Sequence, residues 1–146
     1  MQARDERERL VGALAELQAE LGWEDPPAEA PATAPTPHPG SLLEPEDEAL
    51  MHELGRSLAR LAAAAASAHP PEVPLPESVT TGSVGGAEWV MRSVLEGDDR
   101  TRLSELLPDF VYLVTLPYLD QEEALRLARR TRELLGAGGT DEARSR

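Results

Sequence analysis

The stretch LSELLPDFVYLVTLPYL, residues 103–119, most constrains the fold of this chain, because as a helix it is apolar almost all round. Residues at three- and four-residue spacing form one side, and three leucines fall on another: Leu103, Leu106, Leu107, Phe110, Val111, Val114 and Tyr118, then Leu113, Leu116 and Leu119. A helix that is apolar on every side must be buried on every side. We therefore expect one side to pack on the chain's own core and the other on a second copy.

A membrane span is not expected from this stretch. Pro108 and Pro117 interrupt it, and a span needs about 20 continuous apolar residues. The first nine residues are almost all charged and do not resemble a secretory leader. The sequence therefore favours a cytoplasmic protein with no membrane association.

Composition excludes several classes of function. The 146 residues have room for one domain, and the absence of cysteine excludes disulfides, cysteine zinc sites and thiol nucleophiles. The net charge is −13, which should repel nucleic acid. The arginines at residues 126–132 lie next to Glu122, Glu123 and Glu133 and are typical of a solvated, partly paired helix face. We expect no direct binding to nucleic acid.

The chain divides into four segments. Residues 1–23 are expected to form an isolated N-terminal helix with a narrow leucine stripe. The stripe could dock on the domain or pair with another helix, or the helix could be only loosely attached to the surface. Residues 24–45 are rich in Pro and Ala and predict a disordered linker. Residues 46–136 are expected to form the helical domain, and residues 137–146 a disordered tail.

Helix signals within the domain are clear. Pro45 and three acids open a helix over residues 46–68, and a second is expected over residues 77–97. Pro108 is expected to divide the third helical stretch, and Asp120 with Glu123 has capping-box spacing for a last helix that Gly136 closes. No segment shows the alternation of a strand. The predicted fold is all-α, a small helical bundle.

The sequence lacks the residue patterns of an active site. Its imidazoles, His38, His52 and His69, have no second ligand at metal-binding spacing on a helix. No serine or threonine lies in a context that suggests a nucleophile and its base. We expect no enzymatic activity, no catalytic residues, no metal and no cofactor.

Two sets of residues are candidates for binding. The first set could line a pocket for a small hydrophobic ligand, although such residues at helical spacing are more often core: Trp89, Met91, Tyr112 and Tyr118. The second set lies on the two most apolar helices and is the candidate dimer interface: Val90, Val94, Phe110, Val111, Leu113, Val114 and Leu116.

The amino-acid sequence of residues 82–128 resembles the C-terminal part of TetR/AcrR-family transcriptional regulators, especially those of high-GC bacteria. The shared features run in order along the chain: Gly85-Gly86, Glu96-Gly97, Leu106-Leu107-Pro108 and Pro117-Tyr118-Leu119. The chain uses arginine and no lysine, which agrees with an origin in high-GC bacteria. Asp120 stands where members of the family often have glycine. The resemblance covers under half of the chain.

This resemblance implies a ligand-sensing and dimerising domain in which two subunits build a four-helix bundle. The family's helix-turn-helix cannot be placed before Glu46, so its DNA-binding residues carry over to no position. We therefore expect a regulator-like effector and dimerisation domain without a DNA-binding module. It would homodimerise or pair with a full-length relative. The alternative is a non-regulatory interaction domain or truncated gene product that binds no ligand.

Overall fold

A computed structural model describes residues 2–22, 43–70, 72–73, 75–97 and 101–144, and within these ranges it holds helices and no strand. The helices are α1 (Gln2–Glu20), α2 (Pro45–Ala68), α3 (Glu77–Glu96), α4 (Thr101–Thr115) and α5 (Gln121–Arg144). The predicted all-α bundle is confirmed. The predicted linker at residues 24–45 lies almost entirely outside the described residues.

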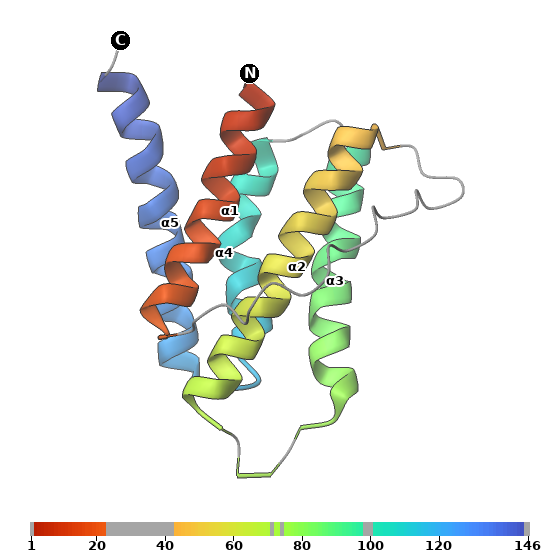
Figure 1. The fold of residues 1–146 in the computed structure, drawn as a ribbon, viewed down its shortest axis with the longest axis vertical. Coiled ribbons are helices and arrows are strands. Elements are labelled where there is room, and N and C mark those ends of the chain that lie inside the picture. The colour runs from red at the N-terminus through yellow and green to blue at the C-terminus, as the bar shows by residue number, and fades with distance from the viewer. Residues whose placement is uncertain (1, 23–42, 71, 74, 98–100, 145–146) are drawn as a thin grey trace.

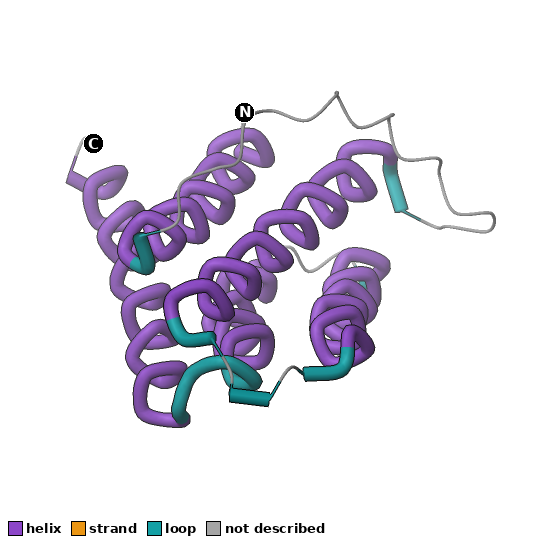
Figure 2. Tube along the Cα trace, turned by 60° about the horizontal axis from the view of Figure 1, so that its bottom comes forward, coloured by secondary structure: helices purple, strands orange, loops and turns teal. Residues whose placement is uncertain are grey.

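The helices form a ring in which each packs on the next and α5 returns to α1 (Figures 1 and 2). Helix α2 also contacts α4 across the middle of the ring. From α2 to α5 the helices alternate in direction, whereas α1 and α2 both begin at the same end of the bundle (Figure 1). Helix α1 is therefore parallel to its neighbour α2.

Helix α1 packs on the bundle, so of the alternatives for its leucine stripe the structure has docking on the domain rather than an isolated helix. Leu10, Leu14 and Leu17 are fully buried between α2 and α5. At the far end of α1, Arg130 Nε of α5 donates to Glu20 Oε1 at 2.8 Å. That hydrogen bond, followed by the charge of the same carboxylate, raises the pKa of Arg130 above its ordinary value. The leucine stripe of α1 is thus part of the core.

Helix α2 is the central element. Pro45 stands in its first turn with three acids, which suit the positive end of the helix dipole. Twelve of its residues are buried, including the predicted stripe that contains Leu54, Leu58 and Leu61. Gly55 is one of them, and a Cβ there would collide with the carboxylate of Glu88 on α3. The missing side chain therefore leaves room on α2 for the Glu88 carboxylate.

Helix α4 differs from its prediction at both prolines. It continues through Pro108 as one helix and ends at Thr115, so Leu116, Pro117 and Tyr118 form a turn. Proline has no N–H to donate to the carbonyl four residues earlier, which weakens the helix. Burial of Leu107 and Val111 on either side of Pro108 compensates for that loss, because each is at most 1% exposed.

Helix α5 begins as predicted and ends later. The Glu123 N–H donates to Asp120 Oδ1 at 2.8 Å, which confirms one half of the expected capping box. The helix does not close at Gly136, and the backbone of residues 137–144 is helical rather than a free tail. A glycine costs about 1 kcal/mol in a helix but does not forbid the conformation.

No helix in the described part of the chain combines the length and apolarity needed to cross a membrane.

Candidate functional site

Helix α3 is the least enclosed helix of the bundle. It packs only on α2 and α4, and it buries three residues, Ala87, Met91 and Leu95, where α2 buries twelve. The helical period turns the opposite side of α3 to solvent. We call that side the α3 outer face, and all its members are exposed: Ser78, Gly82, Gly85, Gly86, Trp89 and Ser93.

Trp89 dominates the α3 outer face because 70% of it is exposed. Tryptophan is usually well covered in a folded chain, and its side chain is among the most frequent anchors of protein interfaces. One or two turns before it, a Cβ built on Gly82, Gly85 or Gly86 would meet no atom within 4 Å. A bulky ring and a bare stretch of backbone thus lie side by side.

The central part of the α3 outer face carries no charge in a strongly acidic protein, and the exposed Glu96, seven residues after Trp89, ends this side of α3. The run from Ser78 to Ala87 holds no charged residue, although the chain as a whole carries −13. The nearest charged side chains of α3 are directed to α2, where Glu88 lies over Gly55 and Arg92 Nη1 pairs with Glu48 Oε1 at 3.1 Å. Ser93 donates its hydroxyl to the Trp89 carbonyl at 3.0 Å, which reduces its polarity.

Helix α4 adds apolar surface beside α3. Leu113 is 42% exposed and Leu116 is 38% exposed. Leu113 lies nine residues, or about two and a half helical turns, after Ser104, so it points to the opposite side of α4. Because Ser104 faces α1, to which Arg9 bonds it, Leu113 lies on the side of α4 away from α1. Leu113 and Leu116 are therefore a second exposed apolar surface of the chain.

The predicted dimer residues divide into three groups. Phe110, Val111 and Val114 are at most 4% exposed in the single chain, so we correct their assignment: they are core residues with no surface for a partner. The surrounding helices cover more of α4 than its composition suggested. Val90 and Val94 are partly buried against the core, and only Leu113 and Leu116 remain broadly exposed.

The predicted pocket residues do not all face the same side of the described helices. Met91 is fully buried, whereas Trp89, two residues earlier, points to solvent on the other side of α3. The Tyr118 hydroxyl hydrogen-bonds with Thr80 Oγ1, which gives this phenol its partner without a ligand. Tyr112 is partly buried. Two surface grooves of about 430 and 490 Å³ lie elsewhere, and none of these four residues lines them.

The residues that sequence reasoning missed are the glycines of α3. Gly82, Gly85 and Gly86 are exposed, and a Cβ built on any of them would meet no neighbouring atom of the described residues within 4 Å. The useful signal was the combination of an uncharged run with glycines three and four residues apart and a tryptophan one turn later. A search for charged or polar motifs cannot detect such a surface.

No protein-family model matches this chain, and no curated protein sequence and no solved structure matches it. Within the described ranges, no group of three His, Asp or Glu residues is placed to hold a metal ion.

Proposed function

We propose that this chain is a helical self-association module that forms a twofold dimer through the α3 outer face. The observation that carries the proposal is the 70% exposure of Trp89 beside three glycines at which a built Cβ would meet no neighbouring atom of the described residues within 4 Å. Exposed apolar patches on soluble proteins mark interaction sites. The bare backbone allows a second helix to approach more closely than side chains would permit.

A second copy of the same helix fits this surface. In a twofold dimer the same patch meets itself. For an antiparallel pair of helices, the residue numbers of any two residues that face each other therefore add up to the same value. An antiparallel pair of α3 helices with its axis beside Gly85 and Gly86 places Trp89 opposite the partner's Gly82. The largest side chain of the face then lies over one of its smallest residues. The face is therefore complementary to itself in shape.

Electrostatics favour the same arrangement. Two copies of a chain with net charge −13 repel each other, and the repulsion is greatest where acidic surfaces meet. Contact through the uncharged run at residues 78–87 brings no like charges into direct opposition. A strongly basic partner would instead be expected to prefer the acidic surfaces. This reasoning selects another copy, or a relative with the same helix, as the occupant.

The biological role that we propose for the dimer follows from the resemblance to TetR/AcrR regulators. The chain would act as a regulatory dimerisation domain that pairs with itself or with a full-length relative, without contacting DNA. The alternative is a plain interaction domain with no regulatory output. A full-length relative that loses operator binding when this chain is added would support the regulatory role, and unchanged operator binding would leave the plain interaction domain.

The oligomeric state in solution tests the proposal directly. Size-exclusion chromatography with light scattering should give about twice the mass of 15.8 kDa at micromolar concentration. Raising the NaCl concentration should strengthen the dimer, because salt screens the repulsion between two acidic subunits and leaves an apolar contact intact. A monomer at 100 μM protein in both low and high salt would refute self-association.

Replacing Gly82, Gly85 and Gly86 together by alanine should have opposite effects on stability and association. Each Gly→Ala change in a helix interior should add about 0.5–1 kcal/mol to the free energy of unfolding of the monomer. The added methyl groups should weaken the dimer by keeping the two backbones apart. Urea titration at low protein concentration measures the first effect, and sedimentation equilibrium measures the second.

Gly12→Ala on α1 is the matched control for these glycine substitutions. Gly12 is also an exposed helical glycine with no atom within 4 Å of a built Cβ. It should stabilise the monomer by a similar amount per residue and leave the dimer unchanged. If the triple variant dimerises as strongly as the parent chain, the close helix approach is wrong.

A further inference from the structure

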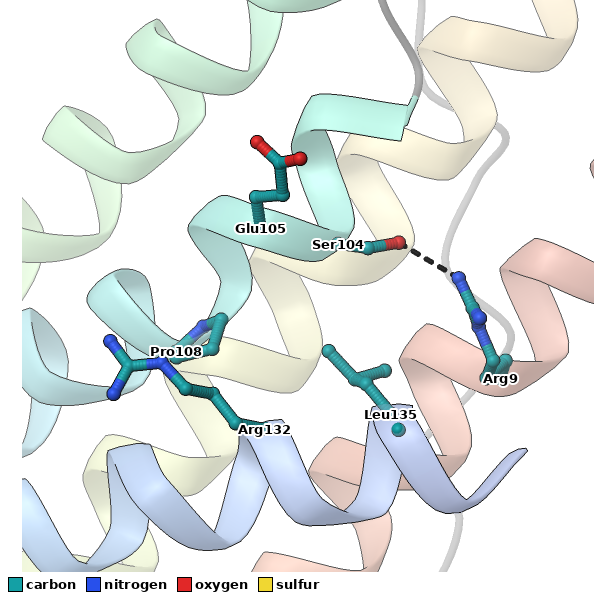
Figure 3. A pocket seen from close by; sticks show the side chains of 7 residues that line it. Arg9, Ser104, Glu105, Pro108, Arg132 and Leu135 are labelled. Atoms are coloured by element: carbon teal, nitrogen blue, oxygen red, sulfur yellow. Dashed lines mark hydrogen bonds between the residues drawn. The ribbon is translucent and has the colours of Figure 1, made fainter. Parts of the chain in front are cut away.

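A groove between α1, α4 and α5 combines cations with an apolar floor (Figure 3). Its volume is about 430 Å³, and it lies on a different side of the bundle from the α3 outer face. The side chains that line it include two arginines and one acid: Arg9, Ser104, Glu105, Pro108, Arg132 and Leu135. Among the lining residues the two arginines outnumber the one acid, and the carboxylates of Glu6 and Asp109 lie beside the groove, bound to Ser104 and Arg132.

Arg9 is incompletely partnered. Its Nη2 donates to Ser104 Oγ at 2.9 Å, and that hydroxyl in turn donates to Glu6 Oε1 at 3.3 Å. Its Nε is buried and has no hydrogen-bond acceptor. A buried donor without an acceptor costs about 1–3 kcal/mol, and more when the group is charged. The guanidinium therefore has unused capacity for an anion.

The other end of the groove is also only weakly neutralised. Arg132 reaches Asp109 at 3.8 Å, and both side chains are more than 60% exposed, so this ion pair contributes little. Leu135 lies between the two arginines, and Pro108 lies beside the Arg132 side chain (Figure 3). These two side chains offer an apolar wall to whatever occupies the space.

We infer that this groove binds a monocarboxylate with a short apolar chain. The carboxylate accepts hydrogen bonds from the Arg9 guanidinium in the two-pronged geometry that this group favours, once the side chain turns from Ser104. The apolar chain lies along Pro108 and Leu135. Glu105 on the rim and the overall acidity of the protein oppose a doubly charged phosphate, which selects a single negative charge.

The inference stands apart from dimerisation, because Arg9 lies on α1 and no residue of the α3 outer face lines the groove. Sodium octanoate and its neutral analogue octanol are the probes, and the full chain labelled with ¹⁵N is the sample. Octanoate should shift the backbone amide signals of α1, α4 and α5 around the groove with a dissociation constant in the millimolar range or below. Octanol should bind at least tenfold more weakly.

Variants identify the anchoring residue. Arg9→Met should weaken octanoate binding at least tenfold, and Arg9→Lys should retain part of it, because lysine keeps the charge but not the planar fork. Arg126→Met on an exposed part of α5 is the control and should bind like the parent chain. The far-UV circular dichroism spectrum checks that each variant is folded.

Three results would overturn the inference. Equal binding of octanol and octanoate would mean that the groove takes any apolar chain. Unchanged binding by a folded Arg9→Met variant would remove Arg9 as the anchor. Amide shifts confined to other parts of the bundle, or none at 10 mM octanoate, would show that the groove is not a carboxylate site.

Discussion

A Trp89→Glu variant is expected to be monomeric at concentrations where the parent chain is a dimer. The substitution removes the main apolar anchor of the α3 outer face, of which 70% is exposed in one chain. It also places one carboxylate from each subunit in the contact, where loss of water penalises charge. Truncating an interface tryptophan commonly costs 2 kcal/mol or more, which corresponds to roughly a thirtyfold weaker dimer. Sedimentation equilibrium from 1 to 200 μM measures the difference.

Val73→Glu is the control for added charge and lost apolar surface. Val73 is 75% exposed, comparable with Trp89, but it lies in the connection between α2 and α3. This variant adds the same charge to the same acidic chain and should dimerise like the parent. If both variants dissociate equally, general charge repulsion is the cause. If Trp89→Glu remains a dimer, the contact lies elsewhere, and the exposed leucines of α4 become the next surface to test.

A Leu14→Ala variant is expected to lose about 2–5 kcal/mol of unfolding free energy. Leu14 is fully buried where α1 packs on α2 and α5, so its truncation removes apolar contacts and leaves a cavity. For a domain of this size each kilocalorie lowers the melting temperature by roughly 2–4 °C. Urea unfolding at a concentration below dimerisation measures the loss without a contribution from association.

Leu125→Ala makes the same chemical change at a site that is 44% exposed on α5. It should cost far less than Leu14→Ala, because much of its side chain is already in water. An equally small loss for both variants would mean that α1 is not part of the cooperative core. That outcome would restore the interpretation of α1 as a loosely attached helix.

Periodicity predicted the faces of the helices but not which face is covered. In residues 103–119 it separated Phe110 and Val114 from Leu113 and Leu116, and the structure buries the first pair and exposes the second. Both pairs are equally apolar in sequence, so only the positions of α2, α3 and α5 decide between them. The same limit applies to α1, whose leucine stripe has no sequence signal for its partners.

Local propensity explains the helix boundaries that were predicted and those that were not. Pro45 and Asp120 act at helix starts, where their effects depend only on the adjacent backbone. The predicted first residues of α2 and α5 therefore agree with the structure to within one residue. Pro108 and Gly136 oppose a helix by amounts that packing or neighbouring turns can outweigh. Trp89 was assigned to a ligand pocket because aromatic residues are usually enclosed, and its exposure depends on the absence of a helix beyond α3.

Helices α1 and α2 pack side by side and run parallel, so they are neighbours in space without being joined by a short connection. Helix α1 ends at the far end of the bundle from the start of α2, so no tight hairpin joins them (Figure 1). Cleavage between residues 22 and 43 would leave α1 held only by its buried leucines and its polar contacts with the other helices. The N-terminal helix would then be a peptide bound in a groove of a four-helix receptor, and its occupancy would depend on concentration like that of any other ligand.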